Sequence, residues 1–242
     1  MPRMGIRAGD GGSVRVGTSG FAYPEWKGSF YPADLPVARM LAYYAERFDT
    51  VEINATFYRM PTAKTLAGWA ALTPERFVFA LKAPQRITHV ARLRGVEEPV
   101  RAFLQAARTL GPRLGPVLFQ LPPTLPRDLD RLGALLALLP PELRTAVEFR
   151  HPSWFADPVY ERLRAAGVAL CVADTEAGTT PLEATAPFGY LRLRDLDYTD
   201  TDLARWARTV RGTWTEAWVY FKHEASGRGP ALAARLRAHL EG

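Results

Sequence analysis

Polar and ionisable residues stand at the ends of eight short apolar segments in this sequence of 242 residues. Three pairs of these residues are spaced two apart: Glu52 with Asn54, Glu148 with Arg150, and Arg192 with Arg194. Side chains two apart on a strand point to the same face, so the members of each pair can project into one site. There the carboxylates could act as general acid or base, while the cations neutralise an anionic substrate.

We expect four of these residues, Glu52, Lys82, Glu148 and Asp174, to be catalytic. The expected substrate-binding residues come from strand ends and the loops after them: Tyr23, Trp26, Asn54, Tyr58, His89, Gln120, Arg150, Trp154, Arg192, Arg194, Lys222 and His223. One polar residue at a strand end usually caps a loop. Eight such ends favour a shared site, because charge near a core is costly without a partner.

Glu148 is the expected central carboxylate of this site. Arg150 lies two residues further along the same strand face and would keep Glu148 ionised, which suits a general base. The alternative is a structural ion pair that ties this strand to a neighbour. Replacing Glu148 by Gln distinguishes the two, since only the catalytic role predicts a large loss of rate in a protein of near-native stability.

The elements that position these residues alternate regularly along the chain. Short runs rich in β-branched and aromatic residues are separated by segments with helical periodicity. The expected strands are 14–18, 50–54, 77–82, 116–120, 145–149, 169–173, 188–192 and 217–222. The segment 175–187 has no helical periodicity and contains Pro181 and Pro187. This pattern predicts an α/β fold, a single TIM-type (β/α)8 barrel with a weak or missing helix between strands six and seven.

An open doubly wound sheet is the main competing fold. It would normally carry a glycine-rich phosphate turn after its first strand, and Gly17-Thr18-Ser19-Gly20 is too short for that fingerprint. In the barrel, the carboxyl ends of all strands meet at one face, where active sites of this fold lie. We expect residues 1–13 to form a flexible, glycine-rich tail and residues 14–242 to form the barrel domain.

Composition limits the class of protein. A hydrophobic fraction of 48% excludes disorder over most of the length. No stretch approaches the roughly 20 apolar residues that span a bilayer, so we expect a cytoplasmic protein without a membrane partner. The single cysteine, Cys171, excludes an intrachain disulfide. The net charge of +6 permits anionic partners, and only four of the 31 basic residues are lysines, which draws attention to Lys82 and Lys222.

Several longer motifs resemble the YecE-like proteins, the domain-of-unknown-function 72 family. They include Gly17-Thr18-Ser19-Gly20-Phe21, Val51-Glu52-Ile53-Asn54-Ala55-Thr56-Phe57-Tyr58-Arg59, Phe119-Gln120-Leu121-Pro122-Pro123, Val147-Glu148-Phe149-Arg150-His151-Pro152-Ser153-Trp154 and Tyr190-Leu191-Arg192-Leu193-Arg194. The resemblance covers roughly residues 14 to 236 and implies a TIM-type barrel, without supplying a reaction. Many members of the family have paired asparagines where this chain has Lys222-His223.

These observations favour an enzyme that acts on a phosphate-containing or otherwise anionic substrate, with phosphodiester hydrolysis of nucleic acid as a specific form. The alternative is a protein that binds nucleic acid or a nucleotide without catalysis, using basic charge and loop aromatics. The sequence leaves the oligomeric state open.

Two further features of the chemistry can be weighed from the sequence. A divalent metal is not specified: Glu52, Glu148, Asp174, His151 and His223 offer ligands, but no metal-binding spacing is present. A Schiff base on Lys82 or Lys222 is a second enzymatic route. Nearby carboxylates would keep the lysine protonated, which disfavours this route.

Overall fold

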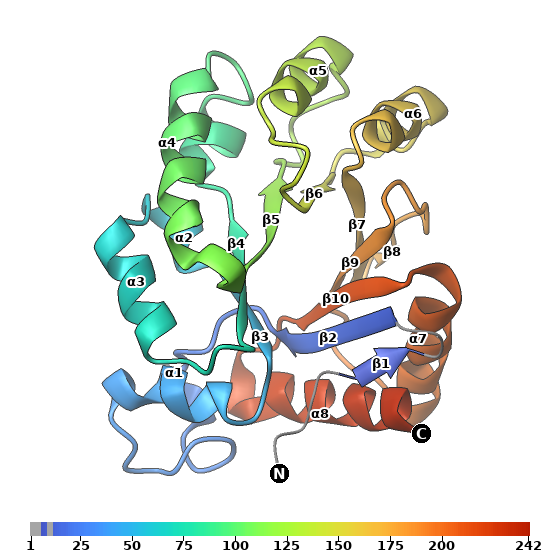
Figure 1. Ribbon diagram of the computed structural model, residues 1–242. Coiled ribbons are helices and arrows are strands. Elements are labelled where there is room, and N and C mark those ends of the chain that lie inside the picture. The colour runs from blue at the N-terminus through green and yellow to red at the C-terminus, as the bar shows by residue number, and fades with distance from the viewer. Residues whose placement is uncertain (1–5, 9–11) are drawn as a thin grey trace.

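The computed structural model describes residues 6–8 and 12–242. Parallel strands form a ring with helices around its outside (Figure 1). The eight parallel strands are β2 (Gly12–Thr18), β3 (Thr50–Ile53), β4 (Val78–Lys82), β5 (Leu114–Gln120), β6 (Thr145–Glu148), β7 (Ala169–Thr175), β9 (Phe188–Leu193) and β10 (Glu216–Phe221). Each coincides with an apolar segment predicted to be a strand, and the fold is the predicted TIM-type (β/α)8 barrel.

The ring is nearly closed. Hydrogen bonding runs in the order β2, β10, β9, β7, β6, β5, β4 and β3. The last seam, between β2 and β3, is held by one isolated parallel bridge between Ser19 and Glu52 and by the Gly20 amide, which donates to the Glu52 carbonyl at 2.8 Å. A Cβ added at Gly17 would lie 2.2 Å from the Thr50 carbonyl oxygen, so glycine permits the close approach of the two strands.

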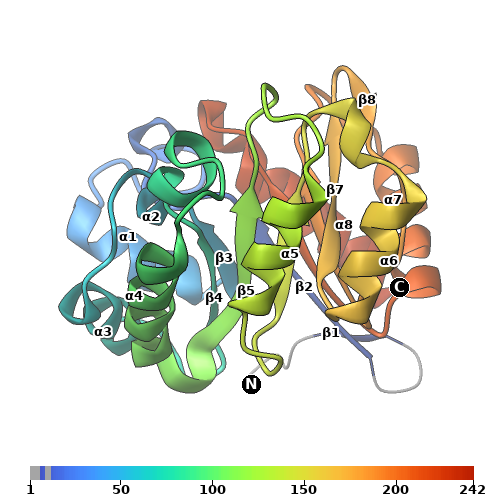
Figure 2. The same ribbon diagram turned by 90° about the horizontal axis from the view of Figure 1, so that it is seen from above.

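Eight α-helices are described outside the strands: α1 (Val37–Ala45), α2 (Ala55–Tyr58), α3 (Ala63–Ala71), α4 (Glu97–Ala107), α5 (Leu129–Ala137), α6 (Asp157–Ala165), α7 (Asp200–Thr213) and α8 (Arg228–Glu241). Shorter helical turns occupy Pro24–Trp26, Arg86–Val90, Arg108–Arg113, Pro152–Trp154 and Ala225–Gly227. Between β7 and β9 the described chain has no helix, as predicted. It forms the two-residue strand β8 (Gly178–Thr179), which pairs antiparallel with β7 and lies at the top of Figure 2.

The barrel interior has its own core, separate from the larger core between strands and helices. It consists of Ala80, Leu118, Ala146, Ala169, Cys171, Phe188, Tyr190, Trp218 and Tyr220. The four large aromatic side chains all come from the neighbouring strands β9 and β10, and they face smaller side chains from β4 to β7. These residues also identify which positions of each strand point inward, because inward positions recur every second residue.

The amino-terminal segment differs from the prediction where it is described. Residues 1–5 and 9–11 of the expected tail lie outside the described residues, and their mobility stays a prediction. Ile6–Ala8 forms a strand, β1, which pairs antiparallel with β2 and brings Ile6 opposite Val14. Within the described residues, no helix is both long enough and apolar enough to cross a membrane.

Candidate functional site at the carboxyl ends of the strands

A buried arginine lies between two buried glutamates at the carboxyl ends of the strands. Arg192 on β9 donates from Nη2 and Nε to Glu52 Oε1 at 3.0 and 3.2 Å, and from Nη1 to Glu148 Oε2 at 2.7 Å. None of the three side chains is more than 1% exposed. Strands that are not adjacent in the ring are thus joined across the barrel interior, as the predicted clustering of strand ends requires.

Both glutamates accept hydrogen bonds from several donors besides Arg192. Glu52 accepts from Ser19 Oγ and, at 2.7 Å, from the Tyr190 hydroxyl. Glu148 accepts from Gln120 Nε2 at 2.8 Å and from Arg150 Nε at 3.0 Å.

These partners also set the ionisation of the two glutamates. Burial by itself would raise the pKa of each carboxyl, but Arg192 and the other donors outweigh that effect, so the pKa of both Glu52 and Glu148 lies below its usual range. Both glutamates are therefore ionised and fully partnered.

Lys82 has a different environment in the same site. It ends β4, its side chain belongs to the inward-facing positions, and the residue is 7% exposed. Its Nζ lies 4.0 Å from the centre of the Phe57 ring, and within the described residues no carboxylate oxygen lies within 4.0 Å of it. Burial and the neighbouring Arg192 lower the pKa of Lys82 to about 7, against the weaker opposing effect of Glu52 and Glu148.

Three further cations surround this buried layer and reach solvent. The side chains of Arg150, Arg194 and Lys222 are 32%, 26% and 34% exposed. Arg194 Nη1 lies 4.0 Å from Glu148 Oε1, and Lys222 Nζ lies 3.8 Å from Glu224 Oε1. Burial and then the adjacent arginines lower the pKa of both Arg194 and Lys222. Together with Arg192, four arginine and lysine side chains lie beside three carboxylates, those of Glu52, Glu148 and Glu224.

Polar and aromatic residues form one side of the mouth, after β2, β3 and β4. Asn54 Nδ2 donates to Ser19 Oγ at 3.2 Å, and the Tyr23 hydroxyl donates to the Ser19 carbonyl at 2.8 Å. Phe57 lies edge-to-face with both Tyr58 and His89, at ring separations of 5.1 and 4.9 Å. Tyr58 is 74% exposed, so its ring is open to a ligand.

Four of the expected site residues do not join this cluster. Asp174 occupies an outward-facing position on β7, because Cys171 and therefore Ala173 face inward. The Asp174 carboxylate accepts hydrogen bonds from Thr179 Oγ1 at 2.5 Å and from the Tyr198 hydroxyl at 2.8 Å. It fastens β8 and the loop after β9 rather than facing Arg192. His223 Nε2 lies 2.5 Å from the Asp195 carbonyl oxygen, which also makes its role a loop contact.

Trp26 and Trp154 are core residues, contrary to the expected contact with substrate. They are 1% and 0% exposed. Trp26 Nε1 donates to the Glu224 carbonyl at 2.9 Å, and Trp154 Nε1 donates to the Leu125 carbonyl at 2.8 Å. Trp154 also stacks on Phe149 with a ring separation of 4.5 Å. Neither indole has a face open to a ligand, because each packs its loop onto the barrel.

Three contributors to the site were not among the predicted site residues: Ser19, Tyr190 and Phe57. Tyr190 lies two residues before Arg192 on the same face of β9, so the spacing argument that selected Arg194 would also have selected it. Phe57 immediately precedes Tyr58, and no spacing rule could show that its ring lies against Lys82. Among the described residues, no three His, Cys, Asp or Glu side chains gather closely enough to hold a metal ion.

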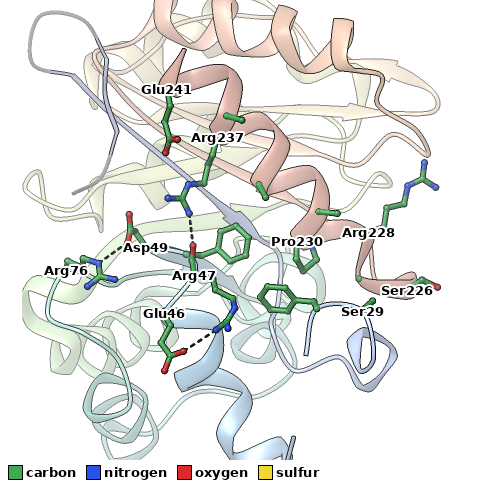
Figure 3. A pocket seen from close by; sticks show the side chains of 16 residues that line it. Ser29, Glu46, Arg47, Asp49, Arg76, Ser226, Arg228, Pro230, Arg237 and Glu241 are labelled. Carbon is green, nitrogen blue, oxygen red and sulfur yellow. Dashed lines mark hydrogen bonds and ion pairs between the residues drawn. The ribbon is translucent and has the colours of Figure 1, made fainter. Parts of the chain in front are cut away.

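A cavity of about 1080 Å³ lies away from this mouth, on the outside of the barrel. It runs along α8 and is bordered by the segment from the end of α1 to the start of β3 (Figure 3). Arg237 crosses it to donate to the Arg47 carbonyl at 2.6 Å, and Arg76 pairs with Asp49 at 3.1 Å. None of the clustered residues of the mouth lines this cavity.

Comparisons with known sequences identify relatives of this chain. It is 35% identical over 144 residues to the UPF0759 protein YecE of Escherichia coli strain K12, a match that covers 59% of this chain and 50% of the relative. It is 32% identical over 142 residues to the UPF0759 protein YunF of Bacillus subtilis strain 168, covering 55% of this chain and 50% of that protein. The chain thus spans about half the length of the curated relatives it matches.

Solved structures agree over nearly the whole chain. The DUF72 family protein TM1631 of Thermotoga maritima superposes with a TM-score of 0.80 at 27% identity and covers 95% of this chain and 99% of its own. The DUF72 family protein EF0366 of Enterococcus faecalis shares the fold, with a TM-score of 0.77 at 18% identity and coverage of 96% and 98%. The profile described as "Protein of unknown function DUF72" matches residues 15–242, and the chain therefore belongs to the DUF72 family.

Proposed function

We propose that the barrel mouth is the active site of an enzyme that acts on an anionic, phosphate-containing substrate. The observation that carries this proposal is the excess of cations: Arg150, Arg194 and Lys222 reach solvent above the buried layer. With Arg192 they outnumber the three nearby carboxylates, those of Glu52, Glu148 and Glu224, by one. Burial is the largest cause of the lowered pKa of Arg194 and Lys222. Repulsion from neighbouring cations in the same cleft lowers the pKa further. A bound anion would relieve it.

Glu52 and Glu148 serve this site best as positioning residues. A general base needs an accessible lone pair and a pKa near the working pH. Both carboxylates have a lowered pKa, are at most 1% exposed and already accept several hydrogen bonds. They hold Arg192 and Arg150 in place, so the arginine planes are set before a substrate arrives. That arrangement stabilises charge on a phosphoryl group without reorganisation.

Lys82 is the group suited to proton transfer. Its pKa of about 7 makes it half neutral at neutral pH, so it can accept a proton from a nucleophilic water or donate one to a leaving group. Hydrolysis of a phosphodiester, including one in nucleic acid, is the specific reaction we propose for this arrangement. The non-catalytic alternative, a nucleotide or nucleic-acid binding protein, would use the same cations and leave Lys82 without a chemical role.

Calorimetric titration with inorganic phosphate tests the anion site. We expect binding that weakens as salt rises, with protons taken up at pH 7, because the bound charge raises the pKa of Lys82 above its value of about 7. Arg194→Ala and Lys222→Ala should each lose roughly tenfold in affinity. Lys64→Ala is the matched control, since Lys64 is exposed on α3, outside the mouth. Equal losses in all three variants would show binding to general surface charge and would contradict the proposal.

Turnover distinguishes the enzyme from the binding protein. A chromogenic phosphodiester and a short oligonucleotide serve as the first substrates. In an enzyme, Lys82→Met should retain phosphate binding and lose on the order of a hundredfold or more in rate, the scale for removal of a general base. Phosphate binding in a wild-type protein that turns over neither substrate would favour the binding protein.

A further inference from the structure

Lys82 stands apart from the other cations of the mouth in its contacts. Arg150, Arg192 and Arg194 each lie within 4.0 Å of a carboxylate of the buried layer, whereas in the part of the chain that the structure describes Lys82 Nζ has no such neighbour. Its nearest described partner is the Phe57 ring, at 4.0 Å. The carboxylates that might have held its proton are occupied by Arg192. Because arginines contact these carboxylates, the carboxylates hold a proton on Lys82 less strongly than the sequence alone suggests, and the amine is available as a nucleophile.

The position of Phe57 against this amine is fixed by the preceding residue. Thr56 Oγ1 lies 3.0 Å from the Ile53 carbonyl and 2.7 Å from the Lys82 carbonyl, and its single hydroxyl hydrogen can be donated to either of them. This contact fastens the start of α2 to the end of β4 and sets the next ring beside the amine. An aromatic face can stabilise an ammonium, but it cannot accept its proton and it excludes water from one side. Burial of this kind favours the neutral amine.

We propose that the Lys82 amine is a nucleophile that forms an imine with a carbonyl compound bearing a phosphate group. This inference rests on the proposed anion site, where the phosphate would lie against Arg150, Arg194 and Lys222. It keeps the anion site but replaces phosphodiester hydrolysis, in which Lys82 would transfer a proton, by a reaction at a carbonyl group. The substrate class becomes phosphorylated aldehydes or ketones.

The covalent step balances without an added reagent. The amine lone pair of Lys82 attacks the carbonyl carbon and forms a carbon–nitrogen bond, and one amine proton passes to the carbonyl oxygen to give a carbinolamine. The carbon–oxygen bond then breaks. The second nitrogen-bound proton leaves with that oxygen as water, and a carbon–nitrogen double bond remains. No oxidant or reductant takes part.

The charged groups that surround this amine are consistent with the step. Burial is the largest effect against an ammonium at Lys82, and Arg192 and Arg150 also repel it, whereas Glu52 and Glu148 attract it. His89, on the turn after β4, has a pKa lowered by burial and by Lys82, so it adds no full positive charge at neutral pH. With a pKa of about 7, Lys82 has a neutral fraction roughly a thousand times that of an ordinary exposed lysine at the same pH.

Reductive trapping tests the proposal on the intact chain. The protein is incubated at pH 7 with dihydroxyacetone phosphate and borohydride, and the modified lysines are located by peptide mass mapping. The chain has four lysines, so Lys27, Lys64 and Lys222 are internal controls. We expect the adduct on Lys82 at least about tenfold above each of the others, given its larger neutral fraction. Dihydroxyacetone, which lacks the phosphate, should trap much less.

Two outcomes separate this inference from the proposed function. Phosphate binding with no adduct on Lys82, or with equal labelling of all four lysines, overturns the imine and leaves the anion site standing. Equal trapping of dihydroxyacetone and its phosphate, with no phosphate binding, overturns the anion site and retains the nucleophile.

The intrinsic reactivity of each lysine provides a test that does not depend on the substrate. Competitive acetylation with acetic anhydride at several pH values reports the pKa of every lysine in the wild-type protein, so no variant needs to fold. We expect Lys82 to titrate near neutrality. Titration of Lys82 at the pH of an ordinary exposed lysine overturns the proposal.

Discussion

The two charged layers of the barrel mouth differ in how completely their charges are matched. In the lower layer, Arg192 donates to two ionised glutamates, and each glutamate has further donors. In the upper layer, the pKa of Lys82, Arg194 and Lys222 is lowered in each case, and among the described residues Lys82 has no carboxylate oxygen within 4.0 Å. Matched charges rigidify a site, whereas unmatched charges leave it ready to bind or to transfer a proton.

Mutations in the two layers should have different consequences. Removing one member of a buried matched set leaves its partners charged and unpaired, which costs stability. Removing a buried unmatched charge relieves an existing penalty. Substitution of a charged residue in the lower layer should therefore lower the free energy of unfolding. Substitution of Lys82 should raise it, although both layers belong to one site.

The largest expected effect is the loss of Arg192. Arg192→Met leaves Glu52 and Glu148 buried without their shared cation, and we expect the free energy of unfolding to fall by about 3–5 kcal/mol. Chemical denaturation measures it. The control is Arg101→Ala, which removes an exposed pair with Glu98 and should change stability by less than about 1 kcal/mol. Similar small changes in both variants would show that the lower layer does not stabilise the barrel.

Lys82→Met should have the opposite sign. The pKa of Lys82 is about 7 in the folded chain and about 10.4 when the chain is unfolded. Between these values the unfolded chain binds more protons, so the wild-type free energy of unfolding rises with pH across this window. Below pH 7 the amine is charged in both states and its burial penalty is complete. We expect the variant to be more stable by about 2–4 kcal/mol at pH 6.

The pH profile supplies the check on Lys82. The advantage of Lys82→Met over the wild type should shrink steadily from pH 7 to pH 10, as the folded wild-type protein already carries a neutral amine there. Denaturation curves of both proteins at several pH values measure this difference, and other titrating groups cancel in it. A constant difference across the range would mean that Lys82 has an ordinary pKa.

Glu148→Gln separates a structural from a catalytic carboxylate. Glu148 accepts hydrogen bonds from Arg192, Gln120 and Arg150. The NH2 group of a glutamine at this position would face at least one of these donors. We expect a loss of about 1–3 kcal/mol in stability and tighter phosphate binding, because the mouth becomes more positive. Denaturation and calorimetry measure the two effects. Near-native stability with a rate on the order of a hundredfold lower would instead identify Glu148 as the general base.

The sequence contains enough information to predict the barrel and the convergence of its polar residues. Apolar runs locate all eight strands, and the two-residue spacing of Arg192 and Arg194 predicts that both face the mouth. The same spacing argues for Tyr190. Asp174 was misplaced because the expected strand ended at Ala173, so its parity against Cys171 was not considered. Parity, once the register is known, therefore decides which strand-end residues share a site.

Contacts between loops lie beyond such reasoning. Nothing in the spacing of Trp26 or Trp154 shows that each indole is buried and hydrogen-bonded to a distant carbonyl, since exposed and buried loop aromatics have the same local pattern. The charge state of Lys82 is likewise outside the reach of such reasoning. Glutamates near a lysine do raise its pKa, but Arg192 engages these glutamates first, and only the three-dimensional arrangement shows that competition.

The smallest expected effect is at the rim, where Tyr58 tests whether the comparison extends to uncharged residues. Tyr58 is 74% exposed, so Tyr58→Ala should change the free energy of unfolding by less than about 0.5 kcal/mol. Inorganic phosphate should bind unchanged, because the cations remain. A phosphate ester with an aromatic ring should bind more weakly by about 1 kcal/mol, the scale of one stacking contact. Calorimetry with both ligands measures this, with Leu196→Ala, exposed on the loop after β9, as the control. If Tyr58→Ala weakens the binding of both ligands equally, the Tyr58 ring acts by positioning the cations and does not contact the ligand.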